Sequence, residues 1–180
     1  MNGHAPMIPQ TFPLAAELVG GGPIPVEERF RVGWSQLDAN GYMRNTAYLD
    51  LAANVRVTYF AAAGFPADGF AQLQFGPVIQ REELEYFREL ELLDEVRVTL
   101  LLAGLSEDAS RFRLRNEFWR GRGVLMARLT SLGGWLDLGV RRLMVPPPAL
   151  AAALRGLGRT PDFESLPPVD PSPRCKLAAS

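Results

Sequence analysis

The sequence predicts an α+β domain in which one long helix precedes four or five antiparallel strands. The helix is predicted because the segment from 47 to 63 is almost wholly apolar, broken only by Asp50, Asn54, Arg56 and Thr58. A helix of that composition must be covered on nearly all sides. After it the hydrophobic period changes from helical to alternating, which is typical of half-buried strands and excludes a four-helix bundle.

The elements before and around the helix follow from turn and capping residues. A first strand is expected from 26 to 34, and Asp-Ala-Asn-Gly at 38–41 supplies the next turn because Asn and Gly tolerate positive φ. Asn45 or Thr46 is the expected N-cap, since either side chain can accept a hydrogen bond from the first helical turn. Gly64 is expected to end the helix.

The strands follow the helix. Residues 77–88 alternate poorly but are bounded like a strand, whereas 96–102 and 111–118 alternate clearly. Arg-Gly-Arg-Gly at 120–123 predicts a hairpin into a long strand that begins at Val124, with a bend at Gly133-Gly134. Prolines 146–148 then open a short helix that reaches Leu157.

The length of 180 residues fits one domain. Residues 1–25 are expected to form an extended lead-in because Pro and Gly recur there, and 26–158 form the domain. Residues 159–180 are rich in Pro and Ser and predict a tail or a surface strap. Its segment 176–179 is consistent with a cloning remnant.

Composition excludes several functions. A net charge of -1 gives no sign of nucleic-acid binding, and no apolar run approaches the roughly 20 residues that span a bilayer. The single histidine, His4, and the single cysteine, Cys175, argue against Ser-His-Asp triads, metal sites and disulfides. We therefore expect a cytoplasmic protein that uses no metal or organic cofactor and does not insert into membranes.

The segment from 34 to 48 carries a recognisable motif. It resembles the hotdog-fold acyl-CoA thioesterases of the 4-hydroxybenzoyl-CoA thioesterase-like kind, with matches at Trp34, Asp38, Gly41, Met43, Asn45 and Tyr48. Three positions depart from the family pattern: Gln36 stands where the first Asp would be, Tyr42 where His is common, and Arg44 where the first Asn is common. The resemblance covers roughly residues 26–148 and implies a hotdog fold, an antiparallel sheet of about five strands wrapped around one long central helix.

The resemblance implies hydrolysis of an acyl-CoA, or acyl-carrier-protein, thioester. Asp38 is the candidate catalytic carboxylate, which would activate water or attack the carbonyl to form an anhydride. The backbone amide near Asn45, at the positive end of the helix dipole, would polarise the carbonyl, and Gly41 would allow the acyl group close to the backbone. The other candidate substrate-binding residues are Tyr42, Met43, Arg44 and Tyr48 for the acyl pocket, and Arg120 and Arg122 for the phosphates of CoA.

Several of these residues also have plainer interpretations. Asp38 could serve only as a turn residue that caps the local backbone, and Tyr48 could serve only in packing. The polar stripe of Asp50, Asn54 and Thr58 fits a site, a helix interface or a solvated edge equally well. Glu82 or Glu83 could supply a second catalytic carboxylate, or both could be surface charge. A phosphate site or a solvated sheet face could be formed by Arg111, Arg113 and Arg115.

Two further readings concern the whole protein. A hotdog hydratase is disfavoured because the Asp and His pair of those enzymes is missing. The alternative from another class is a non-catalytic hotdog module that binds acyl groups or a protein partner.

An open sheet edge and an incompletely covered helix predict a homodimer, with a homotetramer as a further step.

Overall fold

A computed structural model describes residues 26–121 and 123–169 of the chain. The expected lead-in at 1–25 and the segment 176–179 lie outside the described residues. The elements are β1 (Val26–Arg31), η1 (Trp34–Gln36), α1 (Asn45–Ala62), α2 (Ala67–Gln72), β2 (Phe75–Tyr86), β3 (Glu95–Ser106), β4 (Arg111–Arg120), β5 (Val124–Asp137), β6 (Arg142–Met144), α3 (Pro148–Gly156) and β7 (Arg159–Leu166).

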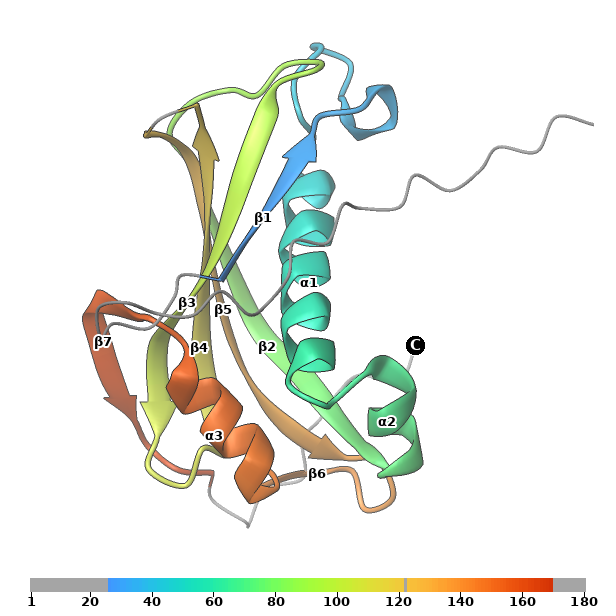
Figure 1. Cartoon of the computed structure of the whole chain (residues 1–180), viewed down its shortest axis with the longest axis vertical. Coiled ribbons are helices and arrows are strands. Elements are labelled where there is room, and N and C mark those ends of the chain that lie inside the picture. The colour runs from blue at the N-terminus through green and yellow to red at the C-terminus, as the bar shows by residue number, and fades with distance from the viewer. Residues whose placement is uncertain (1–25, 122, 170–180) are drawn as a thin grey trace, which may run out of the picture.

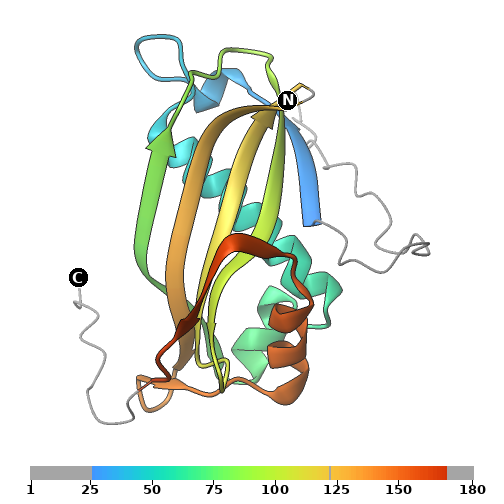
Figure 2. The same ribbon diagram turned by 90° about the vertical axis from the view of Figure 1, so that its left-hand side faces the viewer.

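The strands form one curved sheet with α1 lying along one of its faces (Figure 1). Its order is β1-β3-β4-β5-β2, with β6 paired to β5 and β7 paired to β3. The expectation of about five strands is therefore corrected to seven. All pairings are antiparallel except that of β7 with β3, which is parallel. Strand β2 is an edge strand, and β7 crosses the face of the molecule opposite α1 in Figure 2.

Strand β7 lies within the segment from residue 159 onward that was expected to be a tail or a surface strap. Its sequence has few apolar residues, so hydrophobic alternation could not reveal it. Parallel backbone pairing with β3 and the buried Thr160 and Leu166 attach it to the sheet. Ion pairs add to this attachment: Arg115 donates to both carboxylate oxygens of Asp162 at 2.7 and 2.8 Å, and Arg113 lies 2.8 Å from Glu164. The strand arginines proposed as a phosphate site or a solvated face thus include two that pair with β7.

Helix α1 is buried as its composition requires, although it begins one residue away from the expected cap. Arg44 occupies the N-cap position, and no side chain caps the helix there. The face toward the sheet holds Ala47, Tyr48, Leu51, Ala52, Val55, Arg56 and Phe60, all buried. Asp50 and Asn54 of the polar stripe are exposed, and neither lines the cavity described below.

The lower end of the domain is filled by aromatic side chains around Trp135, which is fully buried. Phe60 of α1 and Phe112 of β4 lie with ring centroids 5.7 and 5.2 Å from the indole. Phe70 stacks on it at 6.1 Å and belongs to α2, a helix of six residues that the sequence did not predict. These rings fix the end of α1 against the sheet.

Gly133 and Gly134 lie inside β5, which continues unbroken to Asp137. A Cβ on Gly133 would stand 2.4 Å from the carbonyl oxygen of Val78, so the neighbouring strand leaves no room for a side chain. The irregularity in this region lies in β2, whose register with β5 shifts between Ile79 and Arg81. Glycine is needed here for close strand approach.

Candidate active site

The residues between β1 and α1 form a tight turn that presents Asp38. Leu37 and Met43 form an antiparallel bridge, and the Asp38 amide donates to the carbonyl of Tyr42 at 2.8 Å. Gly41 has φ +84°, a left-handed conformation in which a side chain is strained. Gly41 is therefore needed for the conformation of the turn, and it does not line the cavity described below.

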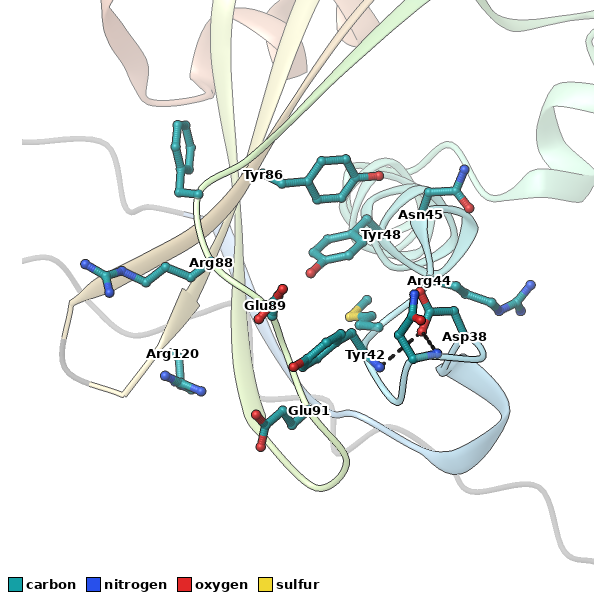
Figure 3. Close-up of a pocket in the computed structure, with 13 residues that line it drawn as sticks. Asp38, Tyr42, Arg44, Asn45, Tyr48, Tyr86, Arg88, Glu89, Glu91 and Arg120 are labelled. Carbon is teal, nitrogen blue, oxygen red and sulfur yellow. Dashed lines mark hydrogen bonds between the residues drawn. The ribbon is translucent and has the colours of Figure 1, made fainter.

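The carboxylate of Asp38 is partly committed to this turn. Its Oδ1 accepts hydrogen bonds from the backbone amides of Asn40 at 2.8 Å and Tyr42 at 3.2 Å (Figure 3). Oδ2 has no hydrogen-bond partner within 26–121 and 123–169. The side chain is exposed, so one oxygen is held by the backbone and the other remains available to water or a substrate.

The departure at Gln36 also has a local explanation. The Gln36 side-chain oxygen accepts from the Gly33 amide at 2.8 Å, and its backbone carbonyl accepts from the Arg44 amide at 2.8 Å. Gln36 thus ties the short helix η1 to the start of α1. Trp34, which opens η1, is 80% exposed beside this turn.

The amino terminus of α1 faces the same space as Asp38. The Asn45 side chain accepts from the Thr46 amide at 2.8 Å, whereas the Asn45 amide itself donates to no residue in the described part of the chain. The first amides of a helix carry partial positive charge, which favours a developing negative charge nearby. The Asn45 amide is therefore available to a carbonyl oxygen.

A second segment reaches the turn from far along the sequence. The Met43 amide donates to the Leu90 carbonyl at 2.8 Å, and Tyr42 forms a bridge with Glu91. This pairing places the chain that leaves β2 against the turn that carries Asp38. Between the two segments is a cavity of about 920 Å³, lined by Asp38, Asn40, Tyr42, Met43, Arg44, Asn45, Tyr48, Tyr86, Phe87, Arg88, Glu89, Glu91 and Arg120.

Two tyrosines close the inner side of the cavity. The rings of Tyr48 and Tyr86 meet edge to face with centroids 5.4 Å apart. Burial, reinforced by negative charge on Tyr86, Asp94 and Glu89, raises the pKa of Tyr48 to about 12. Burial also raises the pKa of Tyr86. Both hydroxyls therefore stay protonated near neutral pH and can donate hydrogen bonds.

Three arginines line the cavity in different ways. Arg44 donates to the Thr46 hydroxyl at 2.7 Å and points away from the tyrosines, and Arg120 pairs with Asp94 at 3.1 Å. Arg88 has no carboxylate within ion-pair distance in the described part of the chain. Figure 3 shows Arg88 and Arg120 on the same side of the cavity, remote from Asn45.

The structure gathers most of the residues that the sequence singled out. Seven of them line one cavity, namely Asp38, Tyr42, Met43, Arg44, Asn45, Tyr48 and Arg120. Gly41 lies outside the lining, and Arg122 lies outside the described residues. Sequence reasoning missed Asn40, Tyr86, Phe87, Arg88, Glu89 and Glu91. The first three of the last five lie within the strand expected at 77–88 and the other two follow it, and nothing in the local sequence pointed to a site because the backbone pairing that brings them here is long-range.

Glu82 and Glu83 lie away from the cavity. Glu82 accepts from the Ser131 hydroxyl at 3.0 Å and pairs with Arg56 at 3.3 Å, whereas Glu83 lies on the outer face of the sheet near Arg81. Neither is a second carboxylate for Asp38. No cluster of potential metal ligands occurs in the described ranges, and none of the helices there is long and apolar enough to cross a membrane.

The profile of the thioesterase-like superfamily matches residues 32–154, well over half of the chain. The chain belongs to this superfamily. The match includes the turn, α1, the strands β2 to β6 and most of α3, and so covers every residue that lines the cavity. None of the curated proteins is detectably similar to the chain in sequence.

Solved structures share the fold of this superfamily member at low sequence identity. A hypothetical protein from Staphylococcus aureus, solved in complex with CoA, is 16% identical with a TM-score of 0.70 and covers 91% of this chain and 99% of its own. A 1,4-dihydroxy-2-naphthoyl-CoA thioesterase from Synechocystis is 15% identical, with a TM-score of 0.66 and coverage of 73% and 96%. A probable thioesterase from Escherichia coli is 16% identical, with a TM-score of 0.61 and coverage of 74% and 99%.

Proposed function

We propose that the protein hydrolyses an acyl-CoA thioester to a free acid and CoA. The observation that carries the proposal is the presence of Asp38 and the unengaged Asn45 amide on one cavity, in a chain of the thioesterase-like superfamily. A thiolate is a good leaving group, so the reaction needs little help from a general acid. Acyl carrier protein is the alternative carrier of the thioester.

The reaction begins at Oδ2 of Asp38. This oxygen takes a proton from water as the water oxygen attacks the thioester carbon, or it attacks that carbon itself to form an anhydride that water later cleaves. The two backbone hydrogen bonds to Oδ1 hold the carboxylate in one orientation. The arrangement thus combines an oriented carboxylate with an exposed approach for water.

The Asn45 amide receives the negative charge that develops on the carbonyl oxygen. Collapse of the tetrahedral intermediate breaks the carbon–sulfur bond, and the thiolate takes a proton from solvent or from Asp38. No metal or organic cofactor takes part in these steps. The helix amino terminus is fixed by the fold, so its dipole is oriented before the substrate binds.

The cavity divides the substrate between two ends. Arg88 and Arg120 lie on one side and would bind the phosphates of CoA, since guanidinium groups match phosphate oxygens. The tyrosine side would hold the acyl group. Arg88, in place of Arg122, is the partner of Arg120 in this proposal, and Tyr42 and Met43 would contact the substrate between the two ends.

The decisive experiment is Asp38→Asn with thiol release measured over a panel of acyl-CoAs. Loss of the carboxylate should lower kcat by on the order of 10²-fold to 10⁴-fold while the unfolding curve stays unchanged. Asn keeps an oxygen for the amides of Asn40 and Tyr42, so the turn is preserved. Gln36→Ala is the matched control, because it disturbs the neighbouring turn without touching the carboxylate. Full turnover in a folded Asp38→Asn protein would refute the assignment.

A non-catalytic acyl-binding module is the second candidate. The two hydrogen bonds that Oδ1 of Asp38 accepts favour it, because they suit a residue that only caps a turn. In that case the wild-type protein binds acyl-CoA and releases no thiol. The same panel of acyl-CoAs, read by both calorimetry and thiol release, separates the two candidates.

A further inference from the structure

Helix α1 and the edge strand β2 touch at two levels, through Tyr48 and Tyr86 at the cavity and through Arg56 and Glu82 further along, with an apolar level between them. Tyr48, Ala52 and Arg56 follow one another every four residues on α1, and Tyr86, Leu84 and Glu82 follow every second residue on β2. Their β5 partners in the register are Ala127, Leu129 and Ser131. Eight residues of helix and four residues of strand both advance by about 12 to 13 Å, so the two elements stay matched over this distance.

The first level is an aromatic wall at the cavity, formed by Tyr48 and Tyr86. Tyr48 is 2% exposed, and its ring also meets Phe118 edge to face at 5.0 Å. Tyr86 is 53% exposed, and its hydroxyl has no hydrogen-bond partner in 26–121 and 123–169. In this wall the Tyr48 ring is fixed in the core, whereas the Tyr86 ring makes few contacts that would fix its position.

The second level is apolar. Ala52 and Leu129 are fully buried, and Leu84 is half-buried against the core. None of these side chains needs a hydrogen bond, and Ala52 is small where Tyr48 and Arg56 are large. The level is accordingly apolar, and none of its three side chains lines the cavity, whereas Tyr48 and Tyr86 do.

The third level is a charged network under an otherwise apolar helix. Arg56 donates to the Ser131 hydroxyl at 2.8 Å and to Glu82 at 3.3 Å, and Ser131 donates to the same Glu82 oxygen at 3.0 Å. The Arg56 side chain is 11% exposed. An alkyl chain that entered this level would leave buried hydrogen-bonding groups unpaired, which is costly.

We propose that Tyr86 determines the length of the acyl group that the cavity accepts. With the tyrosine ring in place the acyl end stops at the wall formed with Tyr48, and without it the chain continues past Ala52 and Leu84 until Arg56, Ser131 and Glu82 stop it. The inference rests on the proposed function for the identity of the ligand. It assigns Tyr86 to specificity, and it gives the Arg56 network the role of a second, deeper limit.

Binding can be tested separately from hydrolysis. S-alkyl-CoA thioethers, from ethyl-CoA to hexadecyl-CoA, cannot be hydrolysed, and their Kd values can be measured by calorimetry. Each methylene buried in the cavity should tighten binding about fourfold, until the chain reaches the wall and the gain stops. Tyr86→Ala should move this break point to longer chains and tighten binding of those chains by on the order of 10-fold or more.

Two variants serve as controls. Tyr86→Phe keeps the ring and should keep the wild-type break point, whereas Val140→Ala alters an exposed side chain between β5 and β6 and should leave the whole series unchanged. Circular dichroism of each variant checks the fold. A Tyr86→Ala protein with the wild-type break point would overturn the proposal, as would a Tyr86→Phe protein that behaves like Tyr86→Ala.

Thiol release from the matching acyl-CoAs tells the two proposals apart. Suppose that the protein binds thioethers, that Tyr86→Ala moves the break point, and that no thiol is released. This result contradicts the hydrolase and supports the role of Tyr86. Thiol release with no break point at any chain length supports the hydrolase and overturns the role of Tyr86. A protein that neither binds thioethers nor releases thiol contradicts both.

Discussion

Replacing Tyr48 with Phe should change how stability depends on pH while leaving the packing of α1 almost intact. The wild-type side chain is 2% exposed and sits between Tyr86 and Phe118. Its pKa is raised by burial to about 12, from an ordinary value near 10. Phe keeps the ring and both edge-to-face contacts but removes the ionisable group.

The sign of the effect follows from which state ionises first. Below about pH 9 the phenol is neutral in both the folded and the unfolded protein, so its raised pKa has no effect on stability. As pH rises through 10 the unfolded chain loses the proton and the folded one keeps it, which favours unfolding. Each pKa unit is worth about 1.4 kcal/mol, so wild type should lose about 1.4 kcal/mol by about pH 11 that Tyr48→Phe does not lose.

Urea unfolding of both proteins at about pH 8 and about pH 11, followed by far-ultraviolet circular dichroism, measures this difference. The other tyrosines and the arginines are common to both proteins and cancel in the comparison. Equal losses in the two proteins would refute the reasoning, because they would mean that Tyr48 ionises as readily when folded as when unfolded. A confirmed difference would establish a neutral hydroxyl donor in the cavity at every physiological pH.

Two further predictions concern the sheet. Gly133→Ala should lower the free energy of unfolding by about 3 kcal/mol, because its Cβ would lie 2.4 Å from the Val78 carbonyl oxygen. Gly76→Ala on β2 is the control: its Cβ would meet nothing within 4 Å, so the free energy of unfolding measured with urea should change by less than about 1 kcal/mol. An equal, small effect of both changes would contradict the close-approach argument. We also propose that two copies pair through the edge strand β2 into a homodimer, which could pair again into a tetramer, so that dilution removes activity before it unfolds the chain. Light scattering during size exclusion that shows an active monomer would count against it.

The fold could be predicted where hydrophobic pattern carried the information. The apolar segment of α1 and the alternating segments of β3 and β4 were predictable, because buried positions in these elements carry apolar side chains. Strand β7 has almost no such pattern, and it joins the sheet through parallel backbone pairing with β3 and the ion pairs of Asp162 and Glu164. Helix α2 was not predicted because its six residues are too few to show the hydrophobic repeat of a helix.

The site divides in the same way. Asp38 and Asn45 were predictable because a turn and a helix start are local features, and the motif places them close in sequence. Tyr86, Arg88 and Glu89 were not, because they reach the cavity only through the backbone pairing of Met43 with Leu90, some 47 positions along the chain. The N-cap was misassigned to Asn45 or Thr46, since Asn45 uses its side chain on the Thr46 amide from inside the helix.

The tryptophans of this protein occupy contrasting environments. Trp34 is 80% exposed and directly precedes the turn of Asp38, whereas Trp135 is fully enclosed by phenylalanine rings at the other end of the domain. Indole emission is red-shifted and open to quenching by iodide in water, and neither holds for an indole in an apolar core. Trp34 is therefore an optical probe of the surface beside the Asp38 turn and Trp135 a probe of the core, while the half-buried Trp119 on β4 contributes a third emission. Iodide quenching can follow changes beside the Asp38 turn at Trp34 in the same sample in which the blue emission of Trp135 reports whether the domain remains folded.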